Sequence, residues 1–107
     1  MLNNSHNRKG IKFIEAEPAI ATDAEAALAY ATGVINRNNP GKGIRWPEGE
    51  KAIATNPRCA YNYTIEVINK NNEGELIRWP EAEKAIATMG YYAREYDNKF
   101  GTNLSKQ

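Results

Sequence analysis

Apolar residues recur along the chain at the spacing of an α-helix, in short stretches separated by polar segments. Gly49, Ala52 and Ile53 stand at positions i, i+3 and i+4, which share one face of a helix. The side chains on this face are small, so a neighbouring helix can approach closely. The spacing predicts a short helix over residues 47–54.

A longer helix is predicted directly after it. Ala60, Tyr63 and Val67 stand at i, i+3 and i+7, again on one helical face. Asn56 is a favourable N-cap, and the proline that follows it is a favourable first helical residue. These signals predict a second helix over residues 57–69. Because no stretch of the sequence alternates as a strand does, the fold class is predicted to be all-α.

This pair of helices belongs to a repeat with a period of 33 residues. The sequence IRWPEGEKAIAT starts at Ile44, and IRWPEAEKAIAT starts at Ile77. A more divergent copy, IKFIEAEPAIAT, starts at Ile11. A fixed period of about 20–50 residues is typical of stacked repeat architectures. We therefore predict a short α-solenoid of three helix–turn–helix repeats, with a compact orthogonal helical bundle as the alternative.

The last copy departs from the other two, as the terminal repeat of a solenoid is expected to do. Arg94 replaces Tyr61, and the second helix carries Asp97, Asn98 and Lys99 where the middle copy has Thr64, Ile65 and Glu66. The predicted segments are a flexible N-terminal tail over residues 1–10, a single domain over 11–101 made of repeats 11–43, 44–76 and 77–101, and a C-terminal tail over 102–107.

Some recurring residues are predicted to be structural. An aromatic residue at a fixed repeat position more often packs between helices than stacks on a ligand. A proline after it is well placed to begin a helix. These structural positions are Phe13, Trp46 and Trp79 before the first helix, Pro47 and Pro80 at its start, and Tyr30, Tyr63 and Tyr96 on the second helix.

The overall composition excludes few classes of function. Fourteen Lys and Arg residues against thirteen Asp and Glu residues give a net charge of +1, so no global field attracts nucleic acid or an acidic membrane. The single cysteine suits a reducing compartment. No apolar run is long enough to span a bilayer. We expect a cytoplasmic protein without a membrane segment.

The repeat resembles a known one. The pattern Arg-Trp-Pro-Glu-x-Glu-x-x-Ile-Ala, followed by Asn-Pro-x-x-Ala-Tyr-x-Tyr-x-x-x-Val, occupies residues 45–67, with a partial copy from Arg78. It resembles a tandem helical repeat of uncharacterised accessory proteins of large tailed bacteriophages. The resemblance implies an accessory phage protein that acts in the host cytoplasm. Small proteins of this sort are often inhibitors of host enzymes or of host defence.

Charged residues also recur in register. Lys12, Arg45 and Arg78 are predicted to stack at about the packing distance of helices, 8–10 Å, as a basic ladder. Glu48 and Glu50 are predicted to stabilise the positive end of the helix that they begin. Because residues i and i+2 do not share a helical face, we do not read them as a catalytic pair. No catalytic residues, metal site or cofactor are predicted.

The sequence therefore favours a non-enzymatic module that binds a host protein. Its partner surface is expected on the basic ladder, on the loops, and where the copies differ. The alternative is binding of RNA or DNA, since helical repeats and helix–turn–helix units can read nucleic acids. Exposed repeat ends would also allow a homodimer. The predicted partner-binding residues are Arg37, Arg45, Tyr61, Lys70, Arg78, Tyr91 and Arg94.

Overall fold

The structure, a computed structural model, describes residues 14–106. Within these residues the chain is all-helical and contains no strand, which confirms the predicted fold class. The predicted tail over residues 1–10 and the structural position Phe13 lie outside the described residues. The α-helices are α1 (Glu17–Ile20), α2 (Ala24–Tyr30), α3 (Pro47–Ile53), α4 (Pro57–Tyr63), α5 (Pro80–Ile86) and α6 (Gly90–Phe100).

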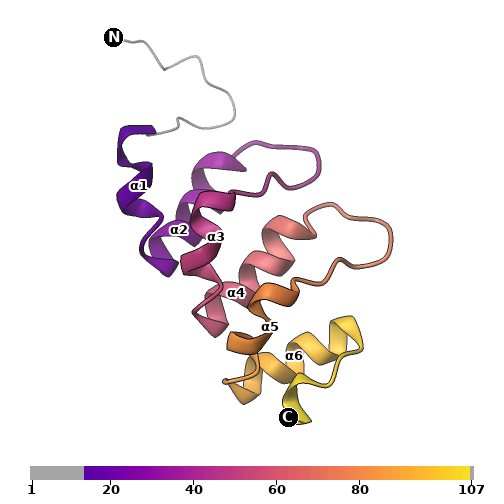
Figure 1. Cartoon of the computed structure of the whole chain (residues 1–107). Helices are drawn as coiled ribbons and strands as arrows, with labels where there is room; N and C mark the ends of the chain where they lie inside the picture. Colours follow the sequence, from indigo (N-terminus) through magenta and orange to yellow (C-terminus); the bar gives the residue numbers. More distant parts are fainter. Residues whose placement is uncertain (1–13, 107) are drawn as a thin grey trace.

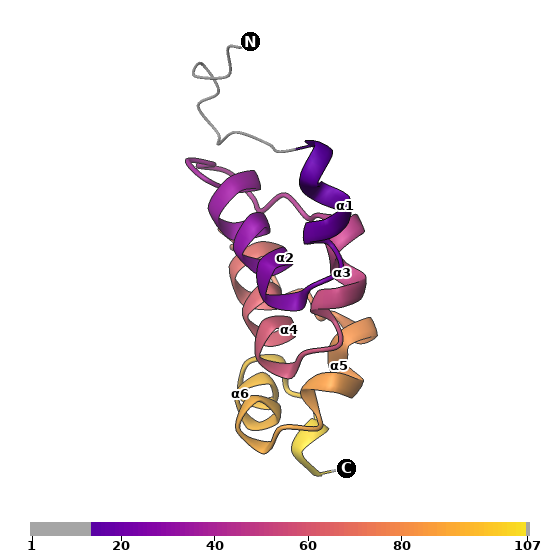
Figure 2. The same ribbon diagram turned by 90° about the vertical axis from the view of Figure 1, so that its left-hand side faces the viewer.

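The helices lie in two rows, which Figure 2 shows side by side. One row holds α1, α3 and α5, which we call the A helices, and the other holds α2, α4 and α6, the B helices. Each B helix packs against the A helix of the following unit, α2 on α3 and α4 on α5. The B helices also contact one another along their row. The A helices pack mainly on B helices rather than on each other, and this leaves space between them.

Local signals set where the helices begin. Asp23 caps α2, with its Oδ2 accepting a hydrogen bond from the backbone amide of Ala26 at 2.8 Å. Asn56 caps α4 in the same way, through the amide of Cys59 at 3.0 Å. Pro47 is the first residue of α3, as the sequence predicted. The predicted helix over residues 47–54 is therefore found within one residue of its expected end.

The second predicted helix is not α-helical over its whole length. After α4 ends at Tyr63, a π-helical segment runs from Thr64 to Ile68, and α2 is followed by a similar segment over Ala31–Ile35. The backbone amide of Asn69 donates to the Thr64 carbonyl, five residues back, at 3.0 Å. Its side-chain Nδ2 donates to the same carbonyl at 2.9 Å. This second bond stabilises the wider turn, and hydrophobic spacing alone does not reveal it.

The same asparagine closes the loop that follows. Asn69 Oδ1 accepts from the amide of Ile77 at 2.8 Å, and Asn69 Nδ2 donates to the carbonyl of Ile77 at 2.9 Å. Asn36 makes the equivalent two bonds with Ile44 at 3.0 and 2.8 Å. Both asparagines are buried. Each loop is thereby held shut at its base by one side chain.

Successive loops are joined to each other, and Figure 1 shows that they project from the same side of the molecule. Lys70 Nζ donates to the carbonyl of Asn39 at 2.7 Å. Asn71 Nδ2 donates to the carbonyls of Pro40 and Gly41 at 3.0 and 2.9 Å. The two loops are equivalent segments of successive repeats, so these bonds connect neighbouring units along the edge from which the loops project.

Aromatic rings make a second link between units. The Trp46 ring lies 4.8 Å from the Tyr30 ring of the preceding unit, and Trp79 lies 5.0 Å from Tyr63. Tyr96 has no following tryptophan, and Phe100 of its own helix covers it at 4.3 Å. Phe100 therefore fills the place that the tryptophan of a further unit would take.

The C-terminal residues differ from the predicted polar tail over 102–107. Residues 104–106 form a 3-10 helix, and Leu104 is buried. The Asp97 carboxylate accepts hydrogen bonds from the hydroxyls of Thr102 and Ser105 and from the amides of Leu104 and Ser105. The chain turns back because Asp97 stands where the preceding unit has Thr64.

Gly43 permits the closest contact between the first loop and the second unit. A Cβ atom at this position would lie 1.7 Å from the carbonyl oxygen of Val67, which is a backbone atom and cannot move aside cheaply. Gly43→Ala is expected to lower the free energy of unfolding by about 2 kcal/mol or more. Urea unfolding followed by circular dichroism measures this. As a control, Gly33→Ala meets nothing within 4 Å and should be neutral or slightly stabilising.

The contacts of Asp97 predict that the stability of the fold depends on pH. Burial acts to raise its pKa, but the hydrogen bonds from Thr102, Ser105 and Leu104 outweigh burial and hold the pKa well below its usual value. A carboxyl with a depressed pKa stabilises the fold above its unfolded pKa of about 4, and this contribution is lost as the pH falls towards the folded pKa. Asp97→Asn should therefore lower the Tm at pH 7 by more than it does near pH 2. An Asn98→Ala control removes no ionisable group and should show no such difference, and an equal loss for Asp97→Asn at both pH values would contradict the assignment.

Candidate functional site

One polar arrangement recurs in each unit and connects the A helix to the B helix. The Tyr63 hydroxyl donates to Glu50 Oε2 at 2.7 Å and accepts from the backbone amide of Trp46 at 2.8 Å. Tyr96 makes the same two bonds with Glu83 and Trp79, at 2.6 and 3.0 Å. We call this arrangement the tyrosine bridge. In the first unit the described part of it is the bond from Tyr30 to Glu17 at 2.6 Å.

Each complete bridge is extended by an arginine. Arg45 Nε and Nη2 contact the two carboxylate oxygens of Glu50 at 2.7 and 3.0 Å, and Arg78 contacts Glu83 at 2.8 and 2.7 Å. The hydrogen bonds from Arg78 are the main reason that the pKa of Glu83 is lowered. Burial of the Tyr63 side chain is the main reason that its pKa is raised above the usual range. Burial raises the pKa of Tyr96 as well, so in the last bridge the Glu83 carboxylate stays ionised and the Tyr96 phenol stays a hydrogen-bond donor.

Both Glu48 and Glu50 lie in the first turn of α3, as predicted, but these contacts give Glu50 a further role. The sequence suggested that Glu48 and Glu50 act alike on the positive end of the helix. Only Glu48 remains exposed there, whereas Glu50 faces inward to Tyr63. The difference follows from helical geometry, because residues i and i+2 point in different directions. A glutamate thirteen residues before a tyrosine in all three copies is the sequence signal that could have revealed the bridge.

The predicted basic ladder also has contacts of its own. The Arg45 guanidinium lies 5.9 Å from the centre of the Trp79 ring, in the next unit, besides its ion pair with Glu50. Lys12, the first member of the ladder, lies outside the described residues. The two described arginines thus support the packing of the units, although about half of the Arg78 side chain remains exposed.

The predicted partner-binding residues fall on three parts of the molecule, of which the first holds Arg45 and Arg78 in their ion pairs with Glu50 and Glu83. Lys70 and the exposed Arg37 belong to the loop edge, where Lys70 holds the first loop. Tyr61, Tyr91 and Arg94 lie on the B helices α4 and α6. The structure therefore does not bring all seven predicted residues together. Whether any of them contacts a partner stays a prediction.

The B-helix residues form a continuous surface that we call the aromatic patch. The Tyr61 ring lies 5.8 Å from the Tyr92 ring, which meets the Tyr91 ring edge-on at 4.9 Å. Tyr91 and Met89 are exposed, at 58% and 46%. The sequence analysis did not select Tyr92 or Met89, although both stand where the earlier copies carry other residues. The patch comprises Tyr61, Met89, Tyr91, Tyr92 and Arg94.

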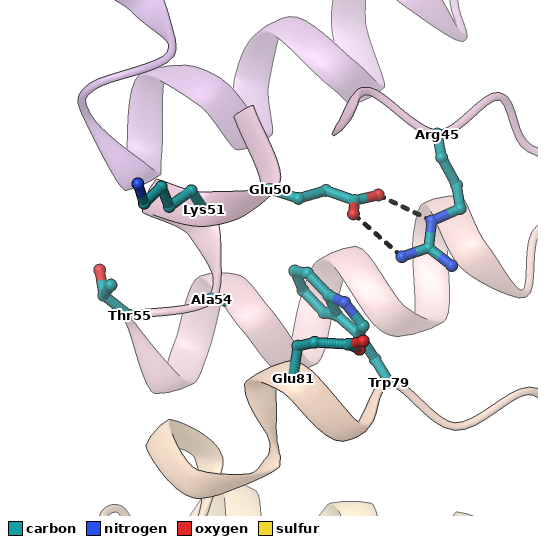
Figure 3. Close-up of a pocket in the computed structure, with 7 residues that line it drawn as sticks. All are labelled: Arg45, Glu50, Lys51, Ala54, Thr55, Trp79 and Glu81. Atoms are coloured by element: carbon teal, nitrogen blue, oxygen red, sulfur yellow. Dashed lines mark hydrogen bonds and ion pairs between the residues drawn. The ribbon is translucent and has the colours of Figure 1, made fainter. Parts of the chain in front are cut away.

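On the A-helix side, two grooves recur one repeat apart. The groove between α3 and α5 has a volume of about 470 Å³, and the groove between α1 and α3 about 480 Å³. Figure 3 shows the first of them, with Lys51 and Thr55 at one end, Arg45 and Glu50 at the other, and Glu81 on the side of α5. Lys51 and Thr55 line both grooves. We call the two together the A-face groove.

Comparison of the chain with protein-family models, curated proteins and solved structures finds no match in any of the three. Among residues 14–106, no group of three or more His, Cys, Asp or Glu side chains is placed to hold a metal ion. In the same part of the chain, no helix has the length and apolar character needed to cross a membrane.

The tyrosine bridge predicts a specific loss of stability. Tyr63→Phe removes one hydroxyl and leaves the buried amide of Trp46 without its acceptor, so the free energy of unfolding should fall by about 1–3 kcal/mol. Tyr61→Phe is the matched control, because its hydroxyl makes no hydrogen bond with any other described residue, and it should change stability by less than about 0.5 kcal/mol. Equal effects of the two substitutions in urea unfolding would show that the bridge contributes nothing.

Proposed function

We propose that this chain is a non-enzymatic protein-binding module whose partner docks on the aromatic patch. The observation that carries the proposal is a cluster of three tyrosine rings on α4 and α6, in which Tyr91 is exposed while Tyr61 and Tyr92 are half-buried against the core. Tyrosine, methionine and arginine are enriched in the buried centres of protein interfaces, and tyrosine and arginine contribute most of the binding energy there. All three residue types occur in the patch.

The position of the patch within the repeat supports the same proposal. Tyr91 stands where the second unit has Arg58, and Met89 stands where it has the N-cap Asn56. The terminal unit has thus given up a favourable capping residue for an exposed apolar one. The bridge residues, by contrast, recur in every unit because packing requires them. The patch is built from positions at which the copies differ. It is therefore particular to one unit, whereas the repeated residues are common to all of them.

We further propose the finer architecture and setting that the sequence suggested. The three helical pairs are interpreted as a short α-solenoid, which is supported by the equivalent contacts of Trp46 with Tyr30 and of Trp79 with Tyr63. The resemblance to phage repeats supports an accessory protein that works in the cytoplasm of a bacterial host. Its partner would be a host enzyme or defence component that it inhibits.

The test is capture of a partner from nuclease-treated bacterial lysate by the immobilised chain. Wild type should retain one protein in stoichiometric amount. Tyr91→Ala/Arg94→Ala should weaken its binding by about thirtyfold or more, because loss of a central tyrosine or arginine commonly costs about 2 kcal/mol. Glu73→Ala/Glu75→Ala changes exposed residues of the second loop, outside the patch, and should bind as wild type does.

The outcomes separate the two functional hypotheses. Equal capture by the aromatic-patch variant and the control variant would place the partner on another surface. Capture from untreated lysate but not from nuclease-treated lysate would favour nucleic-acid binding instead. Binding to nucleic acid would also weaken steeply with salt, since phosphate contacts release counterions.

A further inference from the structure

The first unit exposes a helix face that is buried in the other two units. Figure 2 shows α1 and α2 at the N-terminal end of the two rows. No residue of α1, or of the 3-10 turn Ile14–Ala16 before it, is buried. At the equivalent positions α3 buries Gly49 and Ile53, and α5 buries Ala82 and Ile86. This face is separate from the aromatic patch, which lies on α4 and α6.

In the later units the face is covered by the B helix of the preceding unit, since α2 packs on α3 and α4 packs on α5. The approach is close, because a Cβ atom at Gly49 would lie 3.2 Å from the Cβ of Ala27. The contact between successive B helices shows the same contrast. Cys59 of α4 is fully buried, whereas its equivalent in α2, Ala26, is only half-buried. Among residues 14–106 no B helix precedes α1. We call the face formed by Ala16, Ile20 and Ala26 the open end.

The first unit is built like the unit that receives α4. Its tyrosine donates to Glu17 at 2.6 Å, as the tyrosine of the third unit donates to its glutamate at 2.6 Å. The sequence EAEPAI of residues 15–20 differs at one position from EAEKAI of residues 81–86, and both residues at that position are exposed. Since α4 packs on the second of these segments, α4 shows which kind of helix the first can accept.

One charge at the N-terminal end also favours a helix like α4. Glu25 of α2 pairs with Arg58, its equivalent one repeat later, at 3.0 Å. A helix placed one repeat before α2 would bring its own residue at this position towards Glu25. The Glu25 side chain is 68% exposed and thus accessible to a second cation. A basic residue at this position is therefore attracted, and an acidic one is repelled.

The chain itself has no uncovered B helix to offer within its described residues. The docking faces of α2 and α4 are occupied by α3 and α5. The 3-10 helix Leu104–Lys106 packs on α6, and Phe100 covers the ring of Tyr96. The helix that fits the open end must therefore come from another protein.

We propose that the open end binds an amphipathic helix of a partner protein that resembles α4. This helix carries an alanine at the point of closest approach, as α4 carries Ala60, and a basic residue two positions earlier, as α4 carries Arg58. The alanine allows the backbones to approach, and the apolar face covers Ala16 and Ile20. The basic residue pairs with Glu25.

The probe is a fluorescent peptide of residues 56–70 with Cys59→Ala, which reproduces α4 and cannot form a disulfide. Fluorescence anisotropy with the full chain at low salt should show saturable binding below about 1 mM, weak because so short a helix is marginally stable alone. Ala60→Leu in the peptide should weaken binding by at least about tenfold, since the larger side chain keeps the helices apart. Arg58→Glu should weaken it by about threefold at low salt and by less at high salt.

A substitution in the chain locates the site. Ala16 is exposed, so Ala16→Leu should leave the fold intact, which circular dichroism melting checks. Its equivalent under α4, Ala82, is 0% exposed, so a leucine at position 16 should block docking and weaken binding by at least about tenfold. Lys84→Leu adds the same side chain at an exposed position of α5 and should bind the peptide within about twofold of wild type.

Several results would overturn the proposal. These are no saturable binding, equal affinity for the peptides with and without Ala60→Leu, or equal binding by the two chain variants. A dimer of the chain alone in sedimentation that Ala16→Leu abolishes would place a second copy at the open end and would overturn it as well. Tyr91→Ala/Arg94→Ala should bind the peptide as wild type does, so failure of this proposal is distinguished from failure of the patch proposal.

Discussion

The hydroxyl group of one tyrosine in each unit makes the contact on which the rest of the structure depends. In the second unit it connects a carboxylate on the A helix with the backbone amide of Trp46, which precedes that helix. This amide lies in extended chain and has no helical partner of its own, so without the hydroxyl it would be buried and unsatisfied. The bond fixes the orientation of the tryptophan, and the tryptophan ring then packs on the tyrosine of the preceding unit. One interaction thus sets the geometry both within a unit and between units.

The same reasoning explains how the described chain ends. The last tyrosine, Tyr96, keeps its bonds to Glu83 and Trp79 but has no later tryptophan to cover its ring. Phe100 takes that place, and the residues after Gly101 turn back towards Asp97 instead of opening another loop. Near the start of the same helix, α6, Tyr91 remains 58% exposed. The repeated positions of this unit are thus used for packing, whereas a variable position is left on the surface.

Much of the fold could be predicted from the sequence because its signals are local. The proline at position 47 and the cap at Asn56 place two helix starts, and the spacing of apolar residues gives the all-α class. The π-helical segments could not be predicted from periodicity, since they depend on Asn69 bonding both to a carbonyl five residues back and to a residue eight positions ahead. The single Gly49 difference between the repeated phrases also has a three-dimensional cause. A Cβ atom there would lie 2.4 Å from the Trp46 ring.

The candidate sites were harder to predict for a related reason. Sequence comparison of the copies correctly selects positions that vary, including Tyr61 and Tyr91, but it cannot tell which variable positions lie together. Only the packing of α4 on α6 brings Tyr92 between them. Recurring charged residues cause the opposite error, because residues that look equivalent in the sequence can have different structural roles. Glu48 and Glu50 look alike in the sequence, yet one is exposed beside a groove and the other supports the tyrosine bridge.

The most direct measurement of the central claim is amide hydrogen exchange under native conditions, followed by NMR. If the tyrosine bridge holds the two helices of each unit together and orients the tryptophan against the preceding unit, the amides of Trp46 and Trp79 should exchange only through global unfolding, as slowly as amides in the core of the B helices. This is expected even though neither amide has a backbone partner. Exchange of the tryptophan amides as fast as those of the exposed loop residues Glu75 and Leu76 would contradict the account.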